Sequence, residues 1–234
     1  MNFDVEEGNF FNFHGIKLAD CGVLSPEIRR SIAAGNYESR EMEYVLSNAE
    51  ESDIILELGA GIGAMSSMIL AHTRVRGYVC VEAMPELVAV IKKNHRLNNI
   101  PACEIVAGVM INKAEPEEWL DFHIYEDFWE NSLQGLEGRK ALRTVRIKGY
   151  DFAEQLRKYA PSFIVCDIEG GEFQLFTGGV DLSHVNKVCI EVHDATPKEL
   201  IDLYAFFVDQ GLYLKTPPLR AGVHFFSRGN KGMK

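Results

Sequence analysis

The 234-residue sequence lacks the usual marks of a secreted or membrane-spanning chain. It has no Asn-x-Ser/Thr site, no Cys-x-x-Cys pair and no apolar run near the length of a membrane span. Its first ten residues, MNFDVEEGNF, are acidic and lack the basic start and apolar core of a signal peptide. The cysteines are odd in number, and three of them lie within apolar runs: Cys21, Cys80, Cys103, Cys166 and Cys189. We expect buried free thiols in a reducing, cytoplasmic compartment.

Basic residues are scarce relative to acidic ones. The sequence has 24 Lys and Arg against 34 Asp and Glu, which gives a formal net charge of -10. Only a short tail, 228–234, is locally basic. Because an acidic surface repels phosphate backbones, we expect a small-molecule substrate, with no nucleic acid and no membrane as partner.

The order of apolar runs and turn signals predicts an α/β protein. Strand candidates at 54–58, 78–82 and 103–108 alternate with helix candidates that follow a glycine turn and Pro85, which predicts a parallel sheet. Two more strands are expected at 163–167 and 187–193, and 212–215 with 223–227 as a closing antiparallel pair. Two capping boxes are predicted, at Asp151 with Glu154 and at Thr196 with Glu199.

Two regions differ from this alternation. Residues 1–52 are expected to form a leader or cap region, with an edge strand at 10–18 and a helix at 39–49, ahead of one globular domain at 53–234. Residues 110–149 predict an inserted hairpin or loop near a site. Its aromatic side chains are candidates for a substrate lid: Trp119, Phe128 and Trp129.

A glycine-rich stretch, ELGAGIGA at 57–64, connects the first central strand to its helix. Glycines in such a turn permit close backbone approach, and the helix start offers free N–H groups to a ligand. Glu82 ends the next strand, where an acid can accept hydrogen bonds from both hydroxyls of a ribose. A nucleoside-containing cofactor is therefore expected, and its candidate binding residues are Gly59, Ala60, Gly61, Gly63, Glu82 and Ala83.

The glycine spacing alone leaves two cofactors open. It fits the dinucleotide pattern Gly-x-Gly-x-x-Gly/Ala, which would indicate an NAD(P)-dependent oxidoreductase. Glu57, two residues before the first glycine, resembles instead the acid of the first motif of S-adenosylmethionine-dependent methyltransferases. In that superfamily the acid lies near the amino-acid end of the cofactor, so the resemblance adds Glu57 to the cofactor site.

A second acidic stretch, DIEGGE at 167–172, ends the fourth central strand. It resembles the Asp-x-Glu-Gly-x-Glu signature of the FkbM family of methyltransferases. Other stretches are similar to that family in the same order, over roughly residues 35–195: Tyr37-Glu38 with Glu41, Asn131-Ser132-Leu133, TVRIKGYDF and IEVH. The resemblance implies a Rossmann-like class I methyltransferase fold, with a mostly parallel seven-stranded sheet and helices on both faces. It also implies methyl transfer from S-adenosyl-L-methionine, typically to an oxygen of a sugar or natural product.

Catalytic candidates lie at the carboxyl ends of the fourth and fifth strands, where ligands of open α/β sheets bind. Asp167 is expected near the methyl group and in the cofactor site, with Glu169 beside it if the strand continues. His193 is a candidate general base that Glu191 would orient, or else a structural histidine. Glu172 is expected either in this site or as a helix cap. A metal-free site is favoured, although Asp167, Glu169, His193 and Asp194 could supply metal ligands. A non-catalytic binding subunit of the same fold is the remaining alternative.

Overall fold

The computed structural model describes residues 9–101, 103–112, 118–125, 133, 140–193, 195–217 and 222–229. At the centre of these residues is a seven-stranded sheet of order β11-β12-β10-β9-β3-β4-β5. Its strands are β3 (Ile54–Leu58), β4 (Gly77–Glu82), β5 (Glu104–Ala107), β9 (Phe163–Cys166), β10 (Lys187–Val192), β11 (Leu212–Leu214) and β12 (Gly222–Arg228). The five strands from β5 to β10 are parallel, whereas β12 runs antiparallel to both of its neighbours. The expected mostly parallel seven-stranded sheet is confirmed.

The edge formed by β10, β12 and β11 distinguishes this sheet from a dinucleotide-binding one. Numbered along the chain within the sheet, the strand order is 3-2-1-4-5-7-6, whereas the dinucleotide fold has the order 3-2-1-4-5-6. The last strand is inserted antiparallel beside the fifth, and Leu212 pairs with Arg228 in the closing hairpin. The closing antiparallel pair that the sequence predicts is therefore confirmed.

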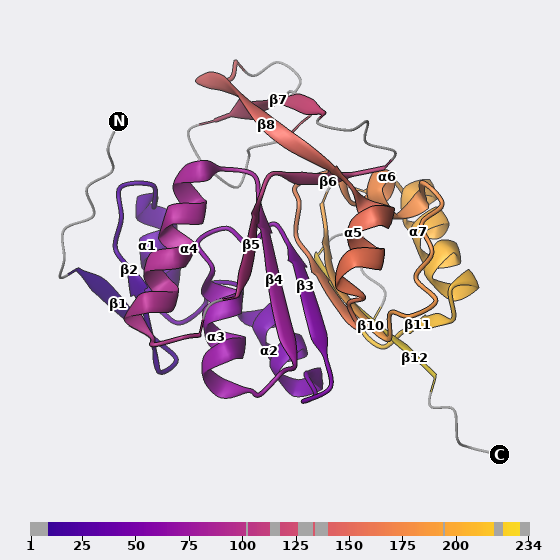
Figure 1. Ribbon diagram of the computed structural model, residues 1–234, viewed down its shortest axis with the longest axis horizontal. Coiled ribbons are helices and arrows are strands. Elements are labelled where there is room, and N and C mark those ends of the chain that lie inside the picture. Colours follow the sequence, from indigo (N-terminus) through magenta and orange to yellow (C-terminus); the bar gives the residue numbers. More distant parts are fainter. Residues whose placement is uncertain are drawn as a thin grey trace.

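Helices cover both faces of the sheet, as expected (Figure 1). Successive side chains of the parallel strands point alternately to two hydrophobic cores. Ile55 and Cys80 belong to one core, while Leu56 and Val81 belong to the other. The first core is covered by α1 (Pro26–Ala33), α2 (Ser39–Asn48), α3 (Ala64–His72) and α4 (Pro85–Leu97). The second is covered by α5 (Phe152–Tyr159), α6 (Glu172–Thr177) and α7 (Pro197–Asp209).

The N-terminal region packs into the first core. Its aromatic stretch forms a hairpin of its own, β1 (Phe10–Phe13) with β2 (Ile16–Ala19), rather than an edge strand of the central sheet. A tight turn at His14-Gly15, with φ of 44° and 88°, folds the stretch back on itself and so pairs its strands with each other. Buried Asn94 of α4 accepts from the Ala19 N–H and donates to the Ile62 carbonyl, both at 2.8 Å. These two hydrogen bonds connect the N-terminal region to the glycine turn through α4.

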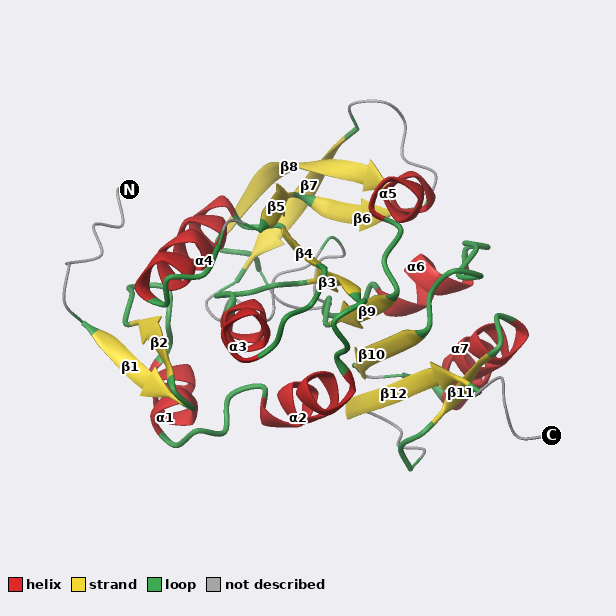
Figure 2. Cartoon of the chain, turned by 60° about the horizontal axis from the view of Figure 1, so that its bottom comes forward, coloured by secondary structure: helices red, strands yellow, loops and turns green. Residues whose placement is uncertain are grey.

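The insert forms a small separate sheet, visible above the central strands in Figure 2. Its order is β6-β8-β7, from β6 (Val109–Ile111), β7 (Trp119–Ile124) and β8 (Arg143–Asp151). Antiparallel pairing of β7 with β8 confirms the predicted hairpin. Trp119 lies on β7 with 53% of its surface exposed. The other two aromatic lid candidates, Phe128 and Trp129, lie outside the described residues, as does Asn131-Ser132.

Of the two predicted capping boxes, one forms completely and the other forms only its first hydrogen bond. Thr196 and Glu199 form the complete capping box at the start of α7, with Pro197 in its first turn. Asp151 caps α5 by accepting a hydrogen bond of 2.8 Å from the Glu154 N–H. None of the helices described here combines the length and apolarity needed to cross a membrane.

Candidate active site

A cavity of about 1290 Å³ lies at the carboxyl ends of the parallel strands. Ligand sites for drug-sized molecules usually have volumes of about 300–1,000 Å³, so this cavity has room for a cofactor together with a second molecule. It is lined by parts of the glycine turn, the ends of β4, β9 and β10, and the region around α2. Its acidic lining residues are Glu27, Glu38, Glu41, Glu82, Asp167, Glu169, Glu191 and Glu199.

The glycine turn adopts a conformation that only glycine tolerates easily. Gly59, Gly61 and Gly63 have φ of 81°, 52° and 73°, in the left-handed region where a Cβ is disfavoured. The N–H groups of Gly59 and Ala60 both donate to the Val81 carbonyl at 3.0 Å, which holds the turn against β4. Of the predicted cofactor residues in this stretch, Gly59 and Gly61 line the cavity, whereas Ala60 and Gly63 are not among the described residues that line it.

We expect Gly59→Ala to destabilise the protein more than its φ alone explains. A Cβ at this position would lie 1.7 Å from the Asp167 carbonyl oxygen, so backbone atoms of β3 and β9 would have to separate. Gly179→Ala is the matched control, because Gly179 has φ of 91° and open space around it. The control should lose about 1–2 kcal/mol from left-handed strain. Chemical unfolding should show a clearly larger loss for Gly59→Ala, and equal losses would contradict the close approach.

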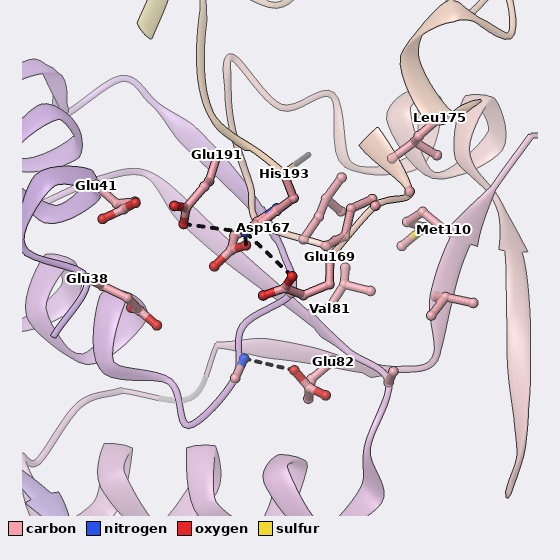
Figure 3. Close-up of a pocket in the computed structure, with 18 of the residues that line it drawn as sticks. Glu38, Glu41, Val81, Glu82, Met110, Asp167, Glu169, Leu175, Glu191 and His193 are labelled. Carbon is pink, nitrogen blue, oxygen red and sulfur yellow. Dashed lines mark hydrogen bonds and ion pairs between the residues drawn. The ribbon is translucent and has the colours of Figure 1, made fainter. Parts of the chain in front are cut away.

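Glu82 holds the glycine turn and faces the cavity. Its Oε2 accepts from the Gly61 N–H and its Oε1 from the Met84 N–H, both at 2.8 Å. Burial raises the pKa of its carboxyl to about 7, against the lowering effect of those hydrogen bonds. Figure 3 shows the Glu82 carboxyl reaching back to the turn. A carboxylate offers about four acceptor positions, so two backbone donors leave capacity for ligand hydroxyls. Ala83, which follows it, also lines the cavity.

Glu57, which the motif resemblance assigned to the cofactor site, does not line this cavity. It is buried, with 3% of its surface exposed. Its Oε2 lies 3.5 Å from Cys80 Sγ, on the sheet face covered by α3 and α4. Strand alternation explains this, because Leu58 and Leu56 on either side of it point to the opposite core. The structure therefore orients Glu57 away from the place where the motif resemblance put it.

Asp167, Glu169 and His193 meet at the carboxyl ends of β9 and β10, as Figure 3 shows. His193 Nε2 lies 3.7 Å from Asp167 Oδ1 and 3.6 Å from Glu169 Oε2. The strand ends at Cys166, so the two acids do not share a direction by continued strand alternation. A turn with Glu169 at φ of 32° and Gly170 at φ of 85° brings them together instead.

The acid that orients His193 is Glu172. Nδ1 of His193 lies 2.9 Å from Glu172 Oε1, and the Glu172 side chain is fully buried. Glu191, the acid that the sequence favoured for this role, lies 4.0 Å from Nε2. Glu172 lies in the first turn of α6, where an acid suits the helix N-terminus, and its side chain also contacts His193, so the structure supports both expectations for it. The Glu172 side chain also accepts from the Gly170 N–H at 3.2 Å, which holds the acidic turn.

Burial raises the pKa values of the two carboxyls beside His193 toward neutral pH. It raises the pKa of Asp167 to about 6 and that of Glu169 to about 7, and neighbouring His193 only partly offsets the effect. For His193, desolvation lowers the pKa, but the hydrogen bond to Glu172 and the charges of Glu169 and Asp167 outweigh it and raise the pKa to about 9. His193 is therefore an imidazolium at pH 7, and the carboxyls beside it are poised near neutrality.

Two acids from the N-terminal region, Glu38 and Glu41, also line the cavity. Glu41 of α2 is buried, and desolvation together with nearby Glu191 raises its pKa to about 7. Glu38 precedes α2 with φ of 48°, and desolvation raises its pKa well above the usual range. Both point toward the cluster in Figure 3. The sequence offered Glu38 and Glu41 only as part of a family resemblance, without a role in the site.

We expect the protein to lose stability as the pH rises from about 5 to about 9. Burial moves the pKa of Glu82 and Glu41 from 4.5 to about 7, so the folded protein retains protons that the unfolded chain releases. His193 acts in the same direction, from 6.5 to about 9. Each contribution is present below the unfolded pKa and is lost as the pH passes the folded pKa. One carboxyl shifted like Glu82 changes the free energy of unfolding by about 3 kcal/mol.

Thermal unfolding at several pH values measures this effect. The melting temperature should fall steadily across the range, and Glu82→Gln and Glu41→Gln should each flatten the decline because an amide does not ionise. Glu43→Gln, at an exposed position of α2, is the control and should keep the full slope. A melting temperature that rises from pH 5 to pH 9 would contradict the burial of these charges.

The same cluster has a geometry compatible with a metal ion. One ligand atom from each of Asp167, Glu169 and His193 lies within 4.8 Å of the others. Asp194, the fourth candidate, lies outside the described residues. The favoured metal-free site stays a prediction. From the insert, Phe122 and Leu133 line the cavity, whereas the lid candidate Trp119 does not.

Comparisons with known proteins find solved structures of similar fold, without a match in sequence. No protein-family model matches the chain, and no curated protein matches it in sequence. Among solved structures, the tRNA m1G37 methyltransferase of M. jannaschii matches with a TM-score of 0.50 and 11% identity over 95% of this chain and 57% of that chain. Precorrin-6y C5,15-methyltransferase from Geobacter metallireducens has a TM-score of 0.48 and 12% identity over 80% and 87%. TYW2 of M. jannaschii in complex with AdoMet has a TM-score of 0.47 and 11% identity over 94% and 86%.

The likeness to the tRNA m1G37 methyltransferase concerns the class of fold. The chain has the Rossmann-like fold that the tRNA methyltransferase also has, with a central, mostly parallel seven-stranded sheet and helices around it. At 11% identity the likeness concerns the fold alone.

Proposed function

We propose that this protein is an S-adenosyl-L-methionine-dependent methyltransferase. The proposal depends on one observation: two acids, Glu82 and Asp167, line the same cavity. Glu82 is hydrogen-bonded to the glycine turn, and Asp167 directly follows β9. Asp167 Oδ1 is buried without a hydrogen-bond partner, as expected of a group that awaits a ligand.

The residues present fit this cofactor. Glu82 would accept from the ribose hydroxyls, while Gly59, Gly61 and Ala83 present backbone to the cavity. The acidic side chains that line the cavity would favour a ligand that carries positive charge. When bound, the cofactor supplies a methyl group activated by its sulfonium. Glu57, buried on the other sheet face, is not part of this site in our proposal.

The acceptor group would be a hydroxyl of a small molecule, a sugar or a natural product. A hydroxyl acceptor needs a group to take its proton, and the most useful base has a pKa near the working pH. Asp167, with a pKa of about 6, meets that need and lies in the cavity. His193, an imidazolium at pH 7, would hold the Asp167 and Glu169 carboxyls in place rather than act as the base itself.

Membership of the FkbM family is part of the proposal and depends on the order of short motifs. The structure brings several of these motifs to one cavity: Tyr37-Glu38 with Glu41, Asp167 with Glu169, and Glu191 with His193. An acid-lined cavity also supports a small-molecule acceptor over nucleic acid, because phosphate groups would be repelled. A cytoplasmic location stays a prediction from the cysteine content.

Calorimetric titration of the purified protein with S-adenosyl-L-methionine, and separately with NADH and NADPH, tests the class. We expect micromolar binding of S-adenosyl-L-methionine alone, followed by transfer of a labelled methyl group in a screen of hydroxylated acceptors. Binding of NADH or NADPH instead would support the alternative function, an NAD(P)-dependent oxidoreductase. Cofactor binding without transfer to any acceptor would favour the non-catalytic subunit.

A further inference from the structure

A second cluster of chemically reactive side chains lies outside the cavity lining, on the sheet face covered by α3 and α4. Cys80 of β4 is directly opposite Glu57 of β3 in the parallel register, and both are buried. Cys103 immediately precedes β5, and His95 comes from α4. The ligand atoms of Cys80, His95 and Cys103 all lie within 4.8 Å of one another, and Glu57 lies beside Cys80.

Three distances in this cluster are those expected between neighbouring ligands of a tetrahedral metal ion. Cys80 Sγ lies 3.9 Å from Cys103 Sγ, and Cys103 Sγ lies 3.5 Å from His95 Nδ1. Cys80 Sγ lies 3.5 Å from Glu57 Oε2. For zinc with ordinary bond lengths, a tetrahedron has edges of about 3.8 Å between two sulfurs and about 3.5–3.6 Å between sulfur and nitrogen or oxygen. The three distances match these edges within about 0.1 Å.

The hydrogen bonds of His95 favour the tautomer that binds metal. Ser66 Oγ donates to the Gly63 carbonyl at 3.2 Å, so its one proton is used there. His95 Nε2, at 2.9 Å from Ser66 Oγ, then carries the ring proton and donates it to that oxygen. The lone pair of Nδ1 consequently points toward Cys103. Fixing the far nitrogen of a histidine in this way is typical of metal ligands.

Glu57 beside this cluster is buried without a Lys or Arg partner among the described residues. Buried carboxylates are costly unless they are paired with a cation or coordinate a metal. Across the ranges that the structure covers, no Lys or Arg forms an ion pair with Glu57. A divalent cation bound by the neighbouring Cys80 would lie close to this carboxyl and would favour its ionised form.

From this geometry we propose a zinc site formed by Cys80, His95 and Cys103, whose ligand atoms all lie within 4.8 Å of one another, with a water molecule in the fourth position and Glu57 beside Cys80. Two thiolates and an imidazole select zinc over the harder cations that prefer oxygen. Each thiol loses its proton as its Zn–S bond forms, so binding releases two protons. The ion would connect β4, α4 and the residue that precedes β5, and its ligand Cys80 is two residues before Glu82. Its role is to hold the glycine turn, and it is independent of the methyl-transfer proposal.

Cobalt titration of the full chain, reduced and stripped of metal by a chelator, tests the site. We expect one equivalent of Co²⁺ to produce thiolate-to-cobalt charge-transfer bands and the intense d–d bands of tetrahedral cobalt, and Zn²⁺ to displace it. Cys80→Ser and Cys103→Ser should each weaken Zn²⁺ binding by more than about a hundredfold, and Ser66→Ala by roughly 10–100-fold. Cys21→Ser, which removes a buried thiol far along the chain, should bind as the wild type does.

Two results would overturn the proposal. One is a folded, reduced wild-type protein, verified by circular dichroism, that binds no stoichiometric Co²⁺ or Zn²⁺. The other is protein purified without oxidant whose mass and thiol count show a Cys80–Cys103 disulfide in place of two free thiols. Because the wild type itself is titrated, misfolding of a variant does not decide the outcome.

Discussion

Glu82→Ala is expected to weaken S-adenosyl-L-methionine binding by about a hundredfold or more. A hydrogen bond to a charged group contributes about 1.5–3 kcal/mol, and Glu82 would accept from two ribose hydroxyls. The loss of about 3 kcal/mol corresponds to roughly two powers of ten in Kd. The same substitution frees the Gly61 and Met84 N–H groups that Glu82 now holds, so the turn loosens as well. Calorimetric titration of variant and wild type measures the difference.

Two companion variants separate these contributions. Glu82→Gln keeps the shape and one acceptor oxygen, so its Kd should lie between those of the wild type and Glu82→Ala. Glu43→Ala removes an exposed acid of α2 and should leave Kd unchanged. Undiminished affinity in Glu82→Ala, with the fold intact by circular dichroism, would remove Glu82 from the cofactor site.

Asp167→Asn is expected to lower kcat by about 10²–10⁴-fold while changing cofactor affinity by less than about tenfold. That range is the usual contribution of a positioned acid or base to a proton transfer. The amide keeps the size of the side chain, so the close contact between the Asp167 carbonyl and Gly59 persists. The measurement is single-turnover transfer of labelled methyl to the acceptor that the screen identifies.

The pH profile distinguishes a base from a merely structural acid. With Asp167 at a pKa of about 6, the wild-type rate should rise through that pH, and the rise should be absent in Asp167→Asn. Asp209→Asn, at an exposed position of α7, should retain both the rate and the profile. An unchanged kcat in Asp167→Asn would assign the proton transfer to another group, with Glu169 the nearest candidate.

Local patterns predicted the fold because they carry its main constraints. Buried parallel strands read as continuous apolar runs, and the glycine turn before α3 and the capping residues of α5 and α7 mark those helix starts without reference to the rest of the chain. The glycine turn, Thr196 with Glu199, and the closing hairpin are all where the sequence placed them. Glu82, Asp167 and His193 were found for a related reason, since the carboxyl ends of parallel strands share one edge of the sheet.

The leader was harder to interpret from its sequence. Helix α1 was not predicted, although Ser25 caps it and Pro26 begins it. Its buried residues, Ile28 and Ile32, are spaced as on one helix face but are few. The hairpin β1–β2 resembled an edge strand because pairing partners are not encoded in a single strand. Which strand lies beside which is decided by long-range contacts, which local propensity does not contain.

The sequence by itself determined the class of fold, the glycine turn and the acids at the strand ends, because strand period, turn chemistry and capping are local. Only the tertiary structure decided which carboxyl meets which partner. Glu57 turns to Cys80, and Glu172 rather than Glu191 holds His193. Those contacts join residues far apart in the chain, and they depend on sheet register and on where β9 ends. The leader's acids reach the cavity for the same reason: packing of α2 against the sheet, rather than any motif around it, puts Glu41 beside Glu191.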